Sequence, residues 1–144
     1  MQTKQGDGRL LLGLRRGEEI HESIIETVAN HQIGHAIVSG IGAIEDVVIG
    51  AYLLDEREYV RRELEGGWEV LSLTGNVGWL DGKPFPHLHV VVSDRECNVL
   101  GGHLFSARVH VTLELVLWTG PERLRRSFDE ETGLKLWDLD GGST

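Results

Sequence analysis

Three histidines are the residues of this sequence best placed to do chemistry. His87 and His89 are separated by a single leucine, and His103 follows a pair of glycines. Side chains two positions apart on a β-strand point to the same face, so the first two imidazoles should face the same way. If a hairpin joins their strand to the next one, His103 comes beside them, because cross-strand neighbours lie close together. The pattern therefore predicts one cluster of three imidazoles.

Such a cluster is typical of a metal site. Three neutral imidazoles with an open fourth position suit Zn²⁺. The same geometry can hold another late divalent ion, since the order of affinities alone does not select the metal. The alternative is that the histidines are hydrogen-bonded polar residues on a half-buried sheet face. We favour the metal site, with zinc as its occupant.

Glu114 is the candidate for a fourth participant. His110, Thr112 and Glu114 alternate with apolar residues and so share one strand face. A carboxylate near a metal can orient a ligand histidine or serve as a catalytic base. The alternative is a surface glutamate. The sequence leaves three possibilities for the fourth metal position: open, filled by Glu114, or filled by a neighbouring subunit.

The elements that must position these residues are one helix and a series of strands. Apolar residues at helical spacing predict a helix over residues 18–31, after a short first strand at 9–14. Strands are expected at 36–43 and 47–53, with a turn at Glu45-Asp46 between them, and then at 59–64, 68–80, 86–93, 99–105 and 109–118. This order predicts an α+β fold with a mainly antiparallel mixed sheet and one principal helix, not an alternating βαβ fold.

Bulk composition indicates a single domain over residues 1–144, with a core at about 9–118 and a polar C-terminal extension at 119–144. No window approaches the roughly 20 apolar residues of a membrane span, and the polar start lacks the apolar stretch of a signal peptide. A single cysteine, Cys97, fits a reducing cytosol. We therefore expect a cytoplasmic protein that does not associate with membranes.

Charge bears on the choice of partner. Fourteen Lys and Arg against 23 Asp and Glu give a net charge of −9, which disfavours DNA as a partner because phosphate binding draws on basic surface. The short arginine groups at 15–16, 61–62 and 123–126 are interrupted by acids, and we expect solvated surface at each.

The motifs together resemble the PPC domain, the plants and prokaryotes conserved domain. The segments that carry the resemblance are Ser39-Gly40-Ile41-Gly42-Ala43, Gly75-Asn76-Val77, GKPFPHLHV at residues 82–90 with Ser93, Gly101-Gly102-His103-Leu104, and Val111-Thr112-Leu113-Glu114. The resemblance covers residues 10–118 and implies an α+β domain that assembles as a homotrimer. In plants this domain accompanies AT-hooks, which contact AT-rich minor grooves, and the present sequence contains no Arg-Gly-Arg-Pro hook.

Three functions are compatible with these features. The first is a metal-binding homotrimer with a small-ligand or regulatory role. The second is a metal-dependent enzyme, a hydrolase or lyase, with Glu114 or a residue at a subunit interface as the base. The third is a DNA-associated regulator. The strands at 47–54 and 109–118 have more apolar positions than one small core needs, which favours burial between subunits.

Overall fold

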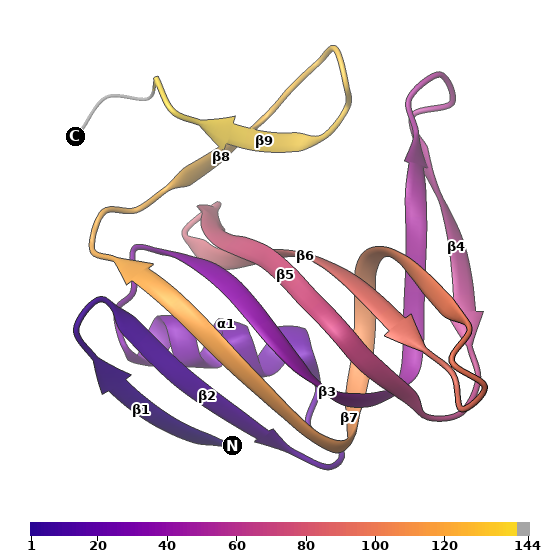
Figure 1. Ribbon diagram of the computed structural model, residues 1–144. Helices are drawn as coiled ribbons and strands as arrows, with labels where there is room; N and C mark the ends of the chain where they lie inside the picture. Colours follow the sequence, from indigo (N-terminus) through magenta and orange to yellow (C-terminus); the bar gives the residue numbers. More distant parts are fainter. Residues whose placement is uncertain (141–144) are drawn as a thin grey trace.

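The computed structural model describes residues 1–140 and confirms the predicted fold class. Within these residues one helix and nine strands of a single sheet follow each other along the chain (Figure 1). The elements are β1 (Gln2–Gly6), β2 (Arg9–Arg15), α1 (Ile20–Asn30), β3 (His35–Leu53), β4 (Glu58–Leu64), β5 (Trp68–Leu80), β6 (Lys83–Ser93), β7 (Val99–Gly120), β8 (Arg125–Phe128) and β9 (Lys135–Asp138). The end of the predicted C-terminal extension, residues 141–144, lies outside the described residues.

The sheet is almost entirely antiparallel. Its strand order is β1-β2-β7-β3-β5-β8-β9, with β4 paired to β3 and β6 paired to both β5 and β7. Among the strands of residues 1–140, the one parallel pairing joins β5 to β8. Strand β7 pairs with β3 along most of its length, with β2 over residues 112–118 and with β6 over residues 99–103. The sheet therefore curves so that both ends of β7 meet its partners, and this brings the region around residue 103 beside β6.

Two expectations about strand boundaries are wrong. The chain does not turn at Glu45-Asp46, because β3 runs unbroken through both residues. Instead, the register against β7 shifts between Glu45 and Val48, and Asp46 has a φ of 53°. The predicted strands at 99–105 and 109–118 are likewise one strand. A β-bulge inserts an extra residue and bends a strand without removing it from the sheet, so polar residues can interrupt the pattern without ending the strand.

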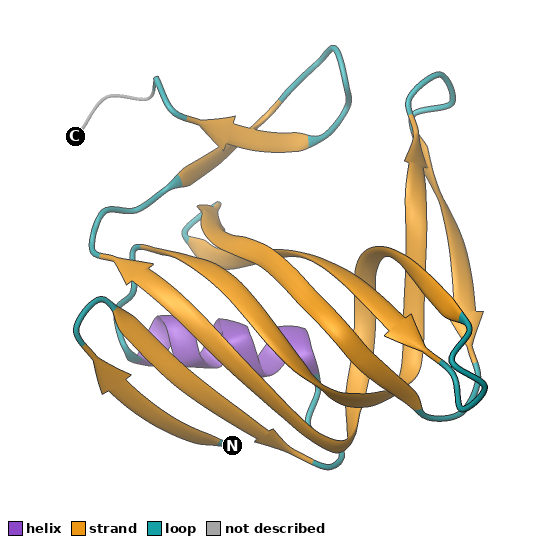
Figure 2. Cartoon of the chain, viewed as in Figure 1, coloured by secondary structure: helices purple, strands orange, loops and turns teal. Residues whose placement is uncertain are grey.

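Helix α1 covers one face of the sheet and contributes three residues to a core built mainly by the strands. Figure 2 shows it as the helix of residues 1–140, lying against the strands. It packs on β6 and β7 and buries Ile20, Ile24 and Val28 completely. Glu19 caps its first turn by accepting a hydrogen bond of 2.7 Å from the backbone N–H of Glu22. Within the described residues, no helix has both the length and the apolar character needed to cross a bilayer.

Two pairings at the ends of the chain were not predicted. The polar start forms β1, whose five residues are all exposed, and the polar tail forms the hairpin of β8 and β9. Neither segment has the alternation of buried and exposed residues from which a strand is predicted. Both are held at the sheet by backbone pairing, β1 to β2 and β8 to β5.

Candidate metal centre

The three predicted histidines lie together on neighbouring strands. His89 on β6 is the registered partner of His103 on β7, and His87 lies two residues before His89. The intervening Leu88 is fully buried on the opposite face. One nitrogen from each imidazole can be chosen so that all three lie within 4.8 Å of one another. Both the expected hairpin and the shared face are present, so a single ion could contact all three rings.

Burial favours the neutral form of two of the three histidines, His87 and His103, and a metal requires that form. Burial lowers the pKa of His103 to about 4, and the nearby His87 and His89 add to the effect. Burial also lowers the pKa of His87, followed by the charge of Arg126 and the neighbouring His89. A divalent ion binds imidazole only through an unprotonated nitrogen. The rings of His87 and His103 are therefore ready to bind a metal at neutral pH without first losing a proton.

One nitrogen of the cluster lacks any partner within the described part of the chain. Nδ1 of His103 is buried and makes no hydrogen bond. A buried polar atom without a partner carries a desolvation cost. The chemistry of the donors, three imidazole nitrogens and no thiolate, fits Zn²⁺ or another late divalent ion.

The glycine pair before His103, Gly101 and Gly102, lies where neighbouring strands approach closely. A Cβ on Gly102 would lie 2.7 Å from the carbonyl oxygen of Gly50 on β3, and one on Gly101 would lie 2.9 Å from that of Val90 on β6. The glycines thus let the backbones of neighbouring strands approach closely at the histidines.

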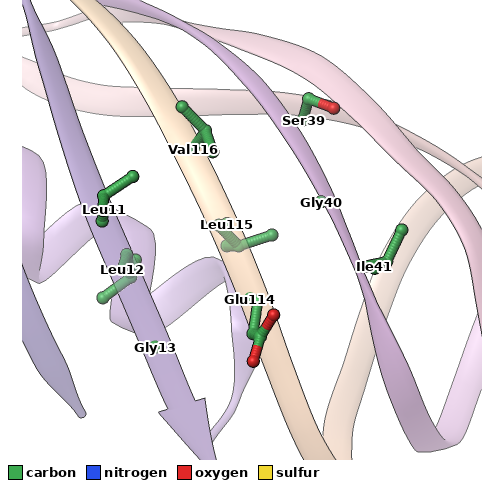
Figure 3. A pocket seen from close by; sticks show the side chains of 9 residues that line it. All are labelled: Leu11, Leu12, Gly13, Ser39, Gly40, Ile41, Glu114, Leu115 and Val116. Atoms are coloured by element: carbon green, nitrogen blue, oxygen red, sulfur yellow. The ribbon is translucent and has the colours of Figure 1, made fainter.

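Glu114 does not join the histidines within this chain. Glu114 is exposed, and its registered partners are Gly13 on β2 and Ile41 on β3. From this part of β7 the path to β6 crosses β3 and β5, which amounts to about 14 Å at the usual strand spacing. Its carboxylate lies instead beside a groove of about 460 Å³ over the open sheet face, between Gly13 and Ile41 (Figure 3).

A cavity of about 360 Å³ adjoins the cluster, and sequence reasoning missed it. His87 and His103 form part of its wall. Its remaining lining comes from β4, β6, β7 and the tail hairpin, and includes three aromatic and three basic residues: Tyr59, Phe85, Phe105, Arg61, Arg126 and Lys135. Strand alternation could have indicated some of these, because Phe85 and Phe105 each lie two residues from a histidine and so share its face.

Arg126 contradicts the expectation that its arginine group is solvated. Its guanidinium donates hydrogen bonds to Oδ1 of Asn76 at 2.6 Å and to the carbonyl oxygen of Lys135 at 2.7 Å, and it lies 3.5 Å from Nδ1 of His87. Its Nε is buried with no partner, and burial lowers its pKa. The sequence around it is a polar tail with no periodicity, so only the pairing of β8 with β5 places this arginine at the cluster.

The tail hairpin also forms hydrogen bonds with the β3–β4 hairpin. The hydroxyl of Tyr52 donates to the carbonyl oxygen of Thr132 at 2.6 Å, and Arg57 donates to that of Glu131 at 3.2 Å. Both donors belong to the β3–β4 hairpin, and both acceptors lie between β8 and β9. The tail hairpin is therefore part of the wall of the candidate site.

Comparisons with known proteins agree with this architecture. The model of the Plants and Prokaryotes Conserved (PCC) domain, the domain abbreviated PPC above, matches residues 1–120. Among solved structures, a metal-containing protein from Archaeoglobus fulgidus is 42% identical with a TM-score of 0.83, over 94% of this chain and 96% of that chain. A PPC protein from Pyrococcus horikoshii is 34% identical with a TM-score of 0.84, over 95% and 94%.

A third structure, described as a putative DNA-binding protein from Bacteroides thetaiotaomicron, is 24% identical with a TM-score of 0.92, over 96% of this chain and 97% of that chain. At that identity the likeness concerns the fold alone. A search of curated proteins found no match. From the matched family model, and from relatives that are more than 30% identical over nearly the whole chain, the protein belongs to the Plants and Prokaryotes Conserved domain family.

Proposed function

We propose that this chain is a metal-binding protein, with one zinc ion held by His87, His89 and His103 and a small-ligand or regulatory role. The observation that carries the proposal is the convergence of three imidazole nitrogens within 4.8 Å, one of them on a ring whose buried Nδ1 has no partner. The metal content of the Archaeoglobus fulgidus protein supports it. The cavity beside the cluster supports the small-ligand role.

Metal analysis of untagged protein tests the proposal. After reconstitution with zinc and removal of free metal, the protein should carry about one zinc per chain, and His103→Ala should carry less than about 0.2. His31→Ala is the matched control, since it removes an imidazole at the end of α1 without touching the cluster. Wild-type protein that retains less than about 0.2 equivalents would refute the zinc site.

We further propose that the protein assembles as a homotrimer through the open face of the sheet. Leu11, Ile41 and Trp118 are 43%, 58% and 49% exposed on this face. Registered pairs place Trp118, Ile37, Asn76 and His87 in one row across β7, β3, β5 and β6, so the apolar surface borders the histidines. Apolar surface of this kind is typical of an interface between subunits. Light scattering during size exclusion should give three chains, and a monomer would contradict the assembly.

A metal-dependent enzyme is the second candidate, and the cavity is the observation that favours it. His87 and His103 line both the cluster and the cavity, so a substrate there could reach an open fourth position. Zinc bound in such a site lowers the pKa of a bound water to about 7. Glu114 of this chain lies too far away to act as the base, which leaves a residue of a neighbouring subunit. In cobalt-substituted protein, a visible spectrum insensitive to added azide would argue against an open position.

DNA binding is disfavoured, although proteins of this fold from Bacteroides thetaiotaomicron and Ralstonia eutropha are described as putative DNA-binding proteins. Both are 24% identical to this chain. The net charge of −9 opposes the electrostatic contribution that dominates non-specific affinity. We expect no mobility shift with AT-rich or random duplex at about 50 mM salt. A shift that weakens steeply with added salt would overturn this expectation.

We also propose a cytoplasmic location. The one cysteine, Cys97, is a free and exposed thiol, and thiols are kept reduced in the cytosol. Fractionation of the source cells followed by immunodetection would test the location.

A further inference from the structure

The cavity beside the histidines differs in charge from the rest of the protein. The chain contains 23 acidic and 14 basic residues, yet among residues 1–140 the cavity lining includes Arg61, Arg126 and Lys135 and no acidic residue. A basic cavity in an acidic protein attracts an anion locally, and its walls of low polarity strengthen the attraction. The ligand of this cavity should therefore carry negative charge.

The rest of the lining is aromatic and aliphatic. Phe85, Phe105 and Tyr59 contribute rings, and Leu134 and Leu136 contribute aliphatic surface from the tail hairpin. The guanidinium of Arg61 lies 4.1 Å from the ring centre of Phe105, which keeps this cation against the wall of the cavity. A ligand that fills the space needs an apolar part as well as its charge.

The contact between Arg126 and His87 points to the position of the charge. Arginine can only donate hydrogen bonds. If His87 binds a metal through its other nitrogen, Nδ1 carries a hydrogen and faces the guanidinium at 3.5 Å. Two donors that face each other need an acceptor between them or beside them.

We propose that this cavity binds a small organic carboxylate, with its carboxylate at Arg126 and Arg61 beside the histidine cluster and its apolar part against Phe85 and Phe105. The inference deepens the proposed small-ligand role and shares its site. A carboxylate is favoured over a phosphate because burying a second negative charge among aromatic side chains adds to the desolvation cost. Planar guanidinium groups also match the carboxylate in geometry.

Benzoate is a suitable probe, since it combines one carboxylate with one aromatic ring. Titration of isotope-labelled protein followed by NMR should give a Kd below about 10 mM with shifts at His87, Phe85 and Phe105. Arg61→Gln and Arg126→Gln should each weaken binding at least about tenfold, as expected for the loss of a charged hydrogen bond. Arg62→Gln and Arg125→Gln are matched controls on the same strands, outside the cavity lining, and should change Kd less than about twofold.

Two further probes test whether the ligand's charge and its carboxylate group are what the cavity recognises. Benzamide, which has the same shape without the charge, should bind at least about tenfold more weakly, and inorganic phosphate should not displace benzoate. Equal binding of benzamide, displacement by phosphate, or no benzoate binding at about 10 mM would each overturn the proposal. The proposal would also be overturned if Arg61→Gln and Arg62→Gln raised the Kd for benzoate equally.

Arg126→Gln also removes hydrogen bonds of the tail hairpin, so thermal unfolding of each variant is measured alongside. Arg61, which contacts the ring of Phe105, keeps the test valid if the Arg126 variant unfolds. Every titration is run on zinc-loaded and on metal-free protein with the zinc content determined. Arginine-dependent benzoate binding without zinc uptake would support the anion site and refute the metal site. Zinc uptake without benzoate binding would support the metal site and refute the anion site.

Discussion

Replacing Gly75 by alanine should displace His87 and weaken both the fold and the metal site. Gly75 on β5 is the registered partner of Leu88 on β6. A Cβ at this position would press on the backbone carbonyl oxygen of His87 and lie 2.9 Å from Cα of Leu88, inside the 3.0 Å limit that real Cβ atoms respect. Both contacts are to backbone, so no side chain can swing away, and the two strands must separate.

The size of the effect follows from this separation. A local movement of about 1 Å is the kind of backbone shift that overpacking causes, at a cost of about 1–3 kcal/mol in the free energy of unfolding. Metal–ligand distances tolerate only about 0.2 Å, so we expect zinc affinity to fall about 10- to 100-fold, as it does when a residue supporting a ligand is lost.

Gly13→Ala is the matched control for this prediction. Gly13 also lies within a strand of the sheet, but the nearest atom to its added Cβ is the carbonyl oxygen of Gln2 at 4.0 Å. We expect its unfolding free energy to change by less than about 0.5 kcal/mol. Denaturant unfolding of metal-free protein at equal concentration gives the stability, and competition with a chromophoric chelator gives the zinc affinity. If the two variants behaved alike in both assays, the close approach of β5 and β6 would not be what positions His87.

Three further predictions concern the core, the pH dependence and the assembly. Leu88→Ala should lower the unfolding free energy by about 2–5 kcal/mol because the side chain is fully buried, which denaturant unfolding measures; a loss below about 1 kcal/mol would contradict this packing. Metal-free protein should lose stability as the pH falls from about 6.5 towards about 4, because the lowered pKa values of His103 and His87 make the unfolded chain bind more protons over this range; His103→Gln should flatten that dependence in unfolding measurements at several pH values. Ile41→Asp, at a residue 58% exposed on the open sheet face, should dissociate the trimer in light scattering, while Val60→Asp on β4, exposed to 53%, should leave it intact.

The course of the strands could be predicted from the sequence where local pattern decides the structure. The expected strand at 68–80 coincides with β5, and the expected helix at 18–31 contains α1. Both have strong periodicity and clear ends. The prediction failed at Glu45-Asp46, where a bulge keeps the chain in the sheet although the residues are typical of a turn. It also failed at β1 and β8, where pairing with a partner strand replaces any pattern of burial.

For the site, the sequence by itself determined the cluster of His87, His89 and His103, because two-residue alternation and one hairpin are local properties of the chain. Only the tertiary structure decided what surrounds it. The path of β7 carries Glu114 several strands away from the histidines, and the pairing of β8 with β5 brings Arg126 to within 3.5 Å of His87 from 39 residues along the chain. These placements depend on contacts between segments distant in sequence, which periodicity does not encode. The histidine cluster could therefore be predicted from the sequence, whereas the basic, aromatic cavity beside it forms only in the folded structure.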